Sequence, residues 1–133
     1  MSERQGDRYV DGSSFEELAG YARAVRRGDV IAVSGTTAND GRGNALHPGD
    51  TAAQTEVALG HALGAVDALG GTIDDVVRTR LLLAPGADWQ AAVRVHARLL
   101  GDVRPANTTL FVHALVGPDF LVEVEVDAII APR

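Results

Sequence analysis

The sequence predicts an α+β fold, in which a mixed sheet is covered on one face by two helices in the order β-β-α-β-α-β-β. Residues 122–128 alternate apolar and acidic side chains, which is the period of a half-buried strand. Residues 51–69 and 89–100 place their apolar side chains at helical spacing. A chain of 133 residues fits one domain with its own core, so residues 1–133 are expected to form a single domain.

The first part of the chain predicts a flexible start and a hairpin. Residues 1–14 are mostly polar and are expected to be flexible. The segments 21–28 and 29–38 are typical of two short strands that meet at a glycine. The following segment, 39–49, is rich in glycine and contains a proline, which indicates a surface loop.

The middle of the chain predicts two helices separated by a strand. Thr51 and Gln54 have the spacing of a capping box at the start of the first helix. Residues 76–84 become continuously apolar, as a strand covered on both faces does. Asp88 is a suitable N-cap for the second helix, and Gly101 ends it. The apolar stripe of this helix comprises Trp89, Ala92, Val93, His96, Leu99 and Leu100.

Two closing strands, 107–112 and 121–131, complete the predicted sheet. Two helices can cover only one face of such a sheet, and its strands carry more apolar side chains than that face can hold. The other face is therefore expected to pack against further copies of the chain.

The composition excludes several chemistries. The chain has no cysteine, so it cannot use thiol nucleophiles, zinc-thiolate sites or iron-sulfur clusters, and a cytoplasmic location is expected. All 12 basic residues are arginine, which excludes lysine Schiff bases. A net charge of -6 argues against nucleic acid as a partner. No apolar run approaches the roughly 20 residues of a membrane span, so no membrane association is expected.

The last strand gathers Glu123, Glu125 and Asp127 on one face, opposite small apolar residues. Like charges at this spacing repel one another, and buried ones must change their pKa or find partners. The pattern indicates either a solvated, charged interface or a chemical site.

Several segments together resemble one family: Tyr21 with AVRRGDVIAVSG, the helix ending in ALGG, then DVVRTRLLLA, GDVRPA and VEVEVDAI. From about Tyr21 to Ala131 the chain is similar to the RidA/YjgF-like family, the reactive intermediate deaminases. The resemblance implies a chorismate-mutase-like fold and a homotrimer with a barrel core, whose three clefts lie between subunits. It also implies hydrolysis of small enamines or imines to a ketoacid and ammonia, without metal or other cofactor.

The chain departs from this family at the substrate-binding motif. Active members have Arg-Ser-Cys after Pro-Ala, and the arginine binds the substrate carboxylate. Here Pro105 and Ala106 are followed by Asn107 at the arginine position and Thr109 at the cysteine position. Asparagine offers a neutral amide in place of a charged, bidentate group, so a typical 2-iminoacid substrate is not expected. Arg104 is an alternative cation three residues upstream.

The resemblance assigns the water-positioning carboxylate to Glu123, and favours Glu125 and Asp127 less. A carboxylate with a pKa near neutrality can accept a proton from water and return one to a leaving amine. The alternative for Glu123 is a charged residue at the surface or at the trimer axis.

Further candidate substrate-binding residues follow from the same resemblance. Tyr21 matches an aromatic residue that closes the cleft from the neighbouring subunit, and Ser34 and Gly35 match a turn that lines it. Trp89 and His113 are candidates for the cleft wall and its mouth. For each of these, ordinary packing in a hairpin, strand end or helix is the alternative.

The other histidines predict no metal site. His96 lies on the apolar stripe of the second helix, where a core or interface histidine is expected. His47 and His61 are expected in a loop and on a helix surface, and the four histidines lack metal-ligand spacing.

Three functions remain open: a small-molecule enamine or imine deaminase, a non-catalytic metabolite-binding or regulatory trimer, and an aminomuconate-deaminase-like pathway enzyme. A ribonuclease is disfavoured by the acidic net charge and by the absence of a recognisable histidine pair.

Overall fold

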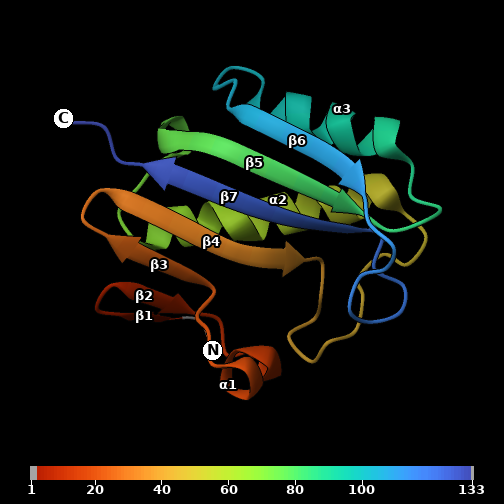
Figure 1. Ribbon diagram of the computed structural model, residues 1–133, viewed down its shortest axis with the longest axis horizontal. Helices are drawn as coiled ribbons and strands as arrows, with labels where there is room; N and C mark the ends of the chain where they lie inside the picture. The colour runs from red at the N-terminus through yellow and green to blue at the C-terminus, as the bar shows by residue number, and fades with distance from the viewer. Residues whose placement is uncertain (1–2, 133) are drawn as a thin grey trace.

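The computed structural model describes residues 3–132, whose elements are β1 (Glu3–Gln5), β2 (Arg8–Val10), α1 (Ser14–Ala19), β3 (Ala24–Arg27), β4 (Val30–Thr37), α2 (Thr51–Ala68), the 3-10 turn η1 (Ile73–Asp75), β5 (Val76–Leu83), α3 (Trp89–Leu100), β6 (Ala106–Phe111) and β7 (Val122–Ile129). One seven-stranded sheet has the order β1-β2-β3-β4-β7-β5-β6. Within residues 3–132, β5 and β6 are the one pair that runs parallel, and the other neighbours are antiparallel. Both long helices lie behind the sheet in Figure 1, so one face of the sheet remains open and the α+β fold class is confirmed.

The N-terminal segment contains elements that the sequence analysis did not predict. Of the stretch 1–14, which was expected to be flexible, residues 1–2 lie outside the described residues. Residues 3–10 form a hairpin that extends the sheet beyond β3, followed by α1. Glu16 of α1 organises this segment because both of its carboxylate oxygens accept backbone N–H groups. The hairpin strands are only three residues long and largely exposed, so they carry almost none of the alternation by which strands are predicted.

The start of α2 also differs from its prediction. The N-cap is Asp50, whose side chain accepts from the backbone N–H of Ala53, and the proposed capping box of Thr51 and Gln54 is not used. Gln54 is instead completely buried. Its amide donates to the carbonyl of Asp119 at 2.8 Å and accepts from the N–H of Leu121 at 2.8 Å. This side chain therefore ties the loop before β7 to the helix.

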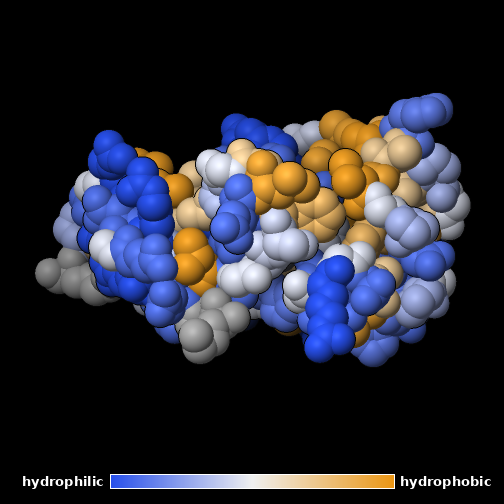
Figure 2. All heavy atoms as spheres, turned by 90° about the horizontal axis from the view of Figure 1, so that it is seen from below, coloured by the Kyte–Doolittle hydropathy of each residue, from blue (hydrophilic) through white to orange (hydrophobic). Residues whose placement is uncertain are grey.

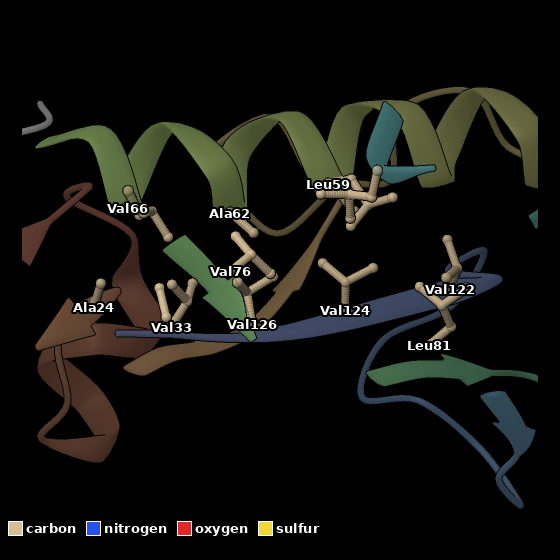
Figure 3. Close-up of a cluster of buried hydrophobic side chains, with 14 of the residues drawn as sticks. Ala24, Val33, Leu59, Ala62, Val66, Val76, Leu81, Val122, Val124 and Val126 are labelled. Carbon is tan, nitrogen blue, oxygen red and sulfur yellow. The ribbon is translucent and has the colours of Figure 1, made fainter. Parts of the chain in front are cut away.

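The core lies between the sheet and α2. Figure 3 shows Leu59, Ala62 and Val66 of α2 pointing toward the apolar face of the sheet. Val124 and Val126 of β7 meet them there and have no exposed surface. Burial of side chains of this size contributes about 1.5–3 kcal/mol each. Strand β7 is thus held in place at the centre of the sheet by its apolar face.

The side of the molecule with α1 and the long loops has a mixed surface (Figure 2). Exposed apolar side chains there include Phe15 and Leu18 of α1 and Val116 of the loop before β7. Helix α3 buries Ala92, Val95 and Leu100, whereas Trp89, expected in its apolar stripe, is 49% exposed. Among the described residues, no helix has the length and apolar character needed to cross a membrane.

Candidate functional site

The acidic face of β7 points to the open side of the sheet, as the alternation predicts. Glu123, Glu125 and Asp127 are partly exposed, while the residues between them are buried. Arg80 of β5 lies opposite and approaches Glu125 at 3.3 Å and Asp127 at 3.5 Å. These pairs are more than a third exposed and contribute little to stability. Arg80 thus pairs with two of the three carboxylates, Glu125 and Asp127, and does not pair with Glu123.

Glu123 is the carboxylate of this face that is not paired. Within residues 3–132 no cation lies within ion-pair distance of it. Burial raises the pKa of Glu123, the Glu125 carboxylate raises that pKa further, and Arg23 lowers it. A carboxylate with a raised pKa is a stronger base than an ordinary glutamate, so Glu123 is better suited to accept a proton.

A bulge in β4 makes room for Glu123. The register of β4 against β7 shifts between Val33 and Thr36, so that Ser34 and Gly35 form the bulge. A Cβ atom on Gly35 would lie 2.7 Å from Oε2 of Glu123. Only glycine allows the carboxyl group to lie against the strand in this way.

The Glu123 cavity has a volume of about 200 Å³. It brings together three residues that the sequence singled out, namely Tyr21, Gly35 and Glu123. Tyr21 lies beside Glu123 within the chain, and its expected closure of a neighbouring subunit's cleft stays a prediction. The remaining lining is partly aromatic and comprises Ser13, Phe15, Arg23, Thr37, Asn39, Gly43, Val116 and Phe120.

Arg23 is a residue of this cavity that the sequence analysis did not single out. Its Nε donates to Asp11 at 2.9 Å, and its Nη1 donates to the backbone carbonyl of Gly35 and to Thr36. Its guanidinium carbon lies 5.6 Å from the centre of the Tyr21 ring, within cation–π distance. In the sequence, the one indication of this role was the position of Arg23, two residues after Tyr21, an aromatic residue that was expected in the cleft. Because Arg23 is already paired with Asp11, it supports the cavity wall and is not an unpaired cation.

Ser34 does not join the Glu123 cavity. Its hydroxyl donates to the backbone carbonyl of Ala22 at 2.7 Å, which links β4 to the segment just before β3. The side chain borders a different, shallow hollow beside α1. In this chain Ser34 therefore has a local structural contact, and Gly35 is the part of the predicted turn that reaches the cavity.

Asn107, Thr109 and Trp89 line a second cavity of about 390 Å³, between α3 and the edge strand β6. The other lining residues are apolar: Leu83, Val93, Leu110 and Phe111. Thr109 donates to Oδ1 of Asn107 at 2.9 Å. The predicted polar pair therefore exists as a hydrogen-bonded unit with an aromatic neighbour.

The two cavities open on opposite faces of the sheet. Asn107 pairs with Thr79, and Thr79 pairs with Val126, which is buried beneath the helices. Cross-strand partners share a face, so Asn107 points to the helix side. Glu123 points to the open side. Within one chain, Asn107 and Glu123 cannot contact the same small molecule.

Two other candidates lie outside both cavities. His113 is exposed in the loop after β6 and lines neither cavity. Arg104, the alternative cation, is also exposed and has a φ of 54° immediately before a proline. The structure therefore gives no support to Arg104 as a replacement for the missing arginine. In residues 3–132 no group of three or more His, Asp or Glu side chains could hold a metal ion.

A Gly35→Ala substitution is expected to displace the Glu123 carboxyl group. The added methyl would lie 2.7 Å from Oε2 and 3.0 Å from Cδ, and the flexible side chain can move into solvent. We expect the pKa of Glu123 to fall toward that of an ordinary glutamate, because burial is the main cause of its rise. Carboxyl ¹³C NMR titration measures this change.

The matched control is Gly60→Ala, on the exposed face of α2, where an added Cβ meets no atom within 4 Å. This variant should leave the Glu123 titration unchanged and stabilise the fold by about 0.5–1 kcal/mol. An unaltered Glu123 titration in Gly35→Ala would show that the bulge does not hold the carboxyl group.

The fold and the Glu123 cavity define a protein of the YjgF type. Residues 12–130 match the family described as Endoribonuclease L-PSP, and the chain belongs to this family, which includes YjgF and RidA. The chain is 34% identical over 107 residues to 3-aminoacrylate deaminase RutC of Acinetobacter baylyi, an alignment that covers 80% of this chain and 84% of RutC.

Two solved structures illustrate the similarity of fold. Rv2704 of Mycobacterium tuberculosis, a member of the YjgF/YER057c/UK114 family, has 40% identity and a TM-score of 0.81, and the match covers 91% of this chain and 96% of that one. The YjgF gene product of E. coli has 26% identity and a TM-score of 0.71, over 82% of this chain and 87% of that one.

Proposed function

We propose that this protein is a hydrolase that deaminates a small enamine or imine, in a cleft formed between copies of the chain. The observation that carries the proposal is Glu123, an unpaired, half-buried carboxylate with a raised pKa beside a glycine bulge. The similarity to a 3-aminoacrylate deaminase supports an enamine substrate, since 3-aminoacrylate is itself an enamine.

Glu123 would act as the general base and acid. As the oxygen of water bonds to the imine carbon, the carboxylate accepts a proton from that water. The protonated Glu123 then gives this proton to the nitrogen, which forms a carbinolamine. In a second transfer Glu123 takes the hydroxyl proton and delivers it to the amino group, so that the C–N bond breaks, ammonia leaves and the carbonyl forms. Positioned acid–base catalysis of this kind contributes about 10²–10⁴-fold to a rate.

A homotrimer would unite the two cavities. Because Glu123 and Asn107 occupy opposite faces of the sheet, a second copy must bring its Asn107 cavity to the open face of the first. Exposed apolar residues at the edge strand, Leu110 and Phe111, are suited to such a contact. The resemblance stated above implies the same arrangement.

The charge of the cavities favours a substrate that is not a typical 2-iminoacid. Arg23 is engaged by Asp11, and no charged side chain lines the Asn107 cavity. A charge-assisted hydrogen bond contributes about 1.5–3 kcal/mol, compared with about 1 kcal/mol for a neutral one. A ligand carboxylate would therefore be bound weakly at Asn107, and an uncharged imine or one whose carboxylate lies elsewhere fits better.

The test is turnover of short-lived imines by the purified full-length protein. Neutral and acidic imines are generated in situ by a pyridoxal-phosphate lyase or an amine oxidase, and ammonia release and semicarbazone formation are followed. We expect hydrolysis faster than in buffer, with neutral substrates preferred over acidic ones. In Asn107→Arg the preference should shift toward acidic substrates by about tenfold or more. Rates equal to buffer for both substrate classes would contradict the proposal.

A non-catalytic metabolite-binding trimer is the second candidate, favoured by Asn107 at the position of the family's arginine. It predicts no turnover in the wild type and equal ligand affinity in wild type and Glu123→Gln. An aminomuconate-deaminase-like enzyme is a narrower version of the first candidate and would show as selective turnover of that substrate. A ribonuclease has less support, because no histidine lines either cavity in the described chain.

A further inference from the structure

A chain of hydrogen bonds links α3 to the Asn107 cavity through β5 and β6. Nε2 of His96 lies 2.7 Å from the hydroxyl of Thr79, and Nδ2 of Asn107 donates to the same hydroxyl at 3.0 Å. Thr109 donates to Oδ1 of Asn107 at 2.9 Å. Thr79 has no exposed surface, so water cannot replace either of its partners.

In this series of hydrogen bonds, the direction of one bond determines the direction of the next. The Thr79 hydroxyl has a single hydrogen, and it accepts one hydrogen from Asn107. The hydroxyl could accept a second hydrogen, but it is buried, and within residues 3–132 Nε2 of His96 is the one acceptor within reach of its own hydrogen. Donation to Nε2 therefore leaves no buried polar group unpaired, and it requires a neutral imidazole protonated on Nδ1. Burial lowers the pKa of His96, in agreement with a neutral ring.

The hydrogen bonds of the Asn107 amide also determine which of its groups is available to a ligand. The oxygen of the Asn107 amide accepts from Thr109, and one N–H is donated to Thr79. The second N–H remains for a ligand. If Nε2 of His96 carried a hydrogen, Thr79 would accept it and donate to Asn107. The amide would then have to turn and place its oxygen beside Thr79.

Nearby charges do not disturb this arrangement. Burial is the one cause of the His96 shift, so no charged side chain contributes to it. Strand β6 has no titratable residue. The other titratable groups of α2, α3 and β5 are exposed or face the open side of the sheet: Glu56, His61, Asp67, Arg78, Arg80, Arg94 and Arg98.

We infer that His96, acting through Thr79, sets the direction of the Asn107 amide, so that the cavity presents an N–H donor and takes a carbonyl oxygen or another acceptor atom of its ligand. His96 and Thr79 are positioning residues, since neither lines the cavity. The inference rests on the proposed function in taking Asn107 as a ligand contact, but its direct test requires no turnover.

The direct test is the tautomer of His96, measured by long-range ¹H–¹⁵N NMR of the full-length protein at pH 7.5. We expect the Nδ1–H form in the wild type and in Thr79→Ser, and loss of that preference in Thr79→Val. His61→Gln, which alters an exposed histidine of α2, is the matched control and should change nothing at His96. A predominant Nε2–H form in the wild type would overturn the inference.

Ligand selectivity is tested with N,N-dimethylacetamide, a neutral acceptor that has no N–H group, by following the side-chain ¹H–¹⁵N signals of Asn107. Its affinity should fall about fivefold as pH decreases through the His96 titration, the equivalent of one neutral hydrogen bond. Thr79→Val should abolish this pH dependence. Absence of any shift at Asn107, or pH-independent binding in the wild type, would refute the selectivity. Failure of imine hydrolysis with the expected tautomer and binding would refute the proposed reaction alone.

Discussion

Replacing Glu123 by glutamine is expected to lower the turnover of an imine substrate by about 10²–10⁴-fold. Glutamine has nearly the same shape and still fits beside Gly35, but it cannot take a proton from water. The pH profile of the wild type should follow the raised pKa of Glu123, with activity increasing as the carboxyl group ionises. Initial rates between pH 4 and 9 measure both effects.

The same substitution should not destabilise the fold. A carboxyl group whose folded pKa is raised binds its proton more tightly in the native state than in the unfolded chain. The stabilisation of the fold by this carboxyl group is fully present below its pKa in the unfolded chain, and it is lost as pH rises through its pKa in the folded protein. Glu123→Gln removes this loss, so the variant should be at least as stable as the wild type at pH values where the wild-type carboxyl group is ionised, as measured by urea unfolding.

Glu125→Gln is the matched control for Glu123→Gln, because Glu125 lies on the same face of β7 and pairs with Arg80. Its turnover should stay within about threefold of the wild type, since Glu125 lies outside the lining of the Glu123 cavity. The variant loses an exposed ion pair and the contribution of Glu125 to the raised pKa of Glu123, whose main cause, burial, remains. Equal losses in both variants would mean that the acidic face acts through its charge alone. Full activity in Glu123→Gln would remove Glu123 from the mechanism.

The largest expected effect on stability is that of Glu16→Ala, at about 2–4 kcal/mol. Oε1 of Glu16 accepts from the N–H groups of Gly12 and Ser13 at 2.8 and 3.1 Å. Oε2 accepts from those of Asp11 and Arg23 at 3.2 and 2.9 Å. Alanine leaves the N–H groups of Asp11, Gly12 and Arg23 without this acceptor. The N–H of Ser13 keeps a second acceptor, Oδ1 of Asp11, at 3.0 Å. Urea unfolding measures the loss, and hydrogen exchange should locate it in the segment before β3.

Glu17→Ala is the control for Glu16→Ala, because the adjacent side chain is exposed and belongs to the same helix. It should change stability by less than about 0.5 kcal/mol. Equal effects of the two substitutions would show that helix propensity, and not the buried carboxylate, governs this region. Since Phe15 and Tyr21 border the Glu123 cavity, Glu16→Ala should also weaken ligand binding there.

Most of the fold follows from local patterns in the sequence. The predicted helix at 89–100 and the predicted strand at 76–84 agree with α3 and β5 to within a residue. Their apolar spacing and end signals are strong because each buries one face against the core. The hairpin β1–β2 and helix α1 were missed because their side chains are largely exposed, so the backbone pairing leaves little trace in hydropathy.

The candidate site was predicted in part. Alternation along β7 identified three carboxylates on one face, and the family resemblance selected Glu123 among them and singled out Gly35. Arg23 was missed as a site residue because its partners, Asp11 and the backbone of Gly35, lie on different elements. Ser34 was expected in the cleft, but the bulge turns its hydroxyl toward Ala22. Periodicity cannot reveal such contacts, because they depend on which strands become neighbours.

The sequence by itself determined that this chain is an α+β domain of the YjgF/RidA type with an acidic strand and an asparagine at the arginine position. Each of these features depends on residue types and on their spacing along the chain, so the sequence alone is enough to predict it. Only the tertiary structure decided that Glu123 is unpaired and half-buried, and that Asn107 lies on the opposite face of the sheet. Strand order, register and the β4 bulge produce that arrangement, because they set which face each side chain occupies and which charges become neighbours.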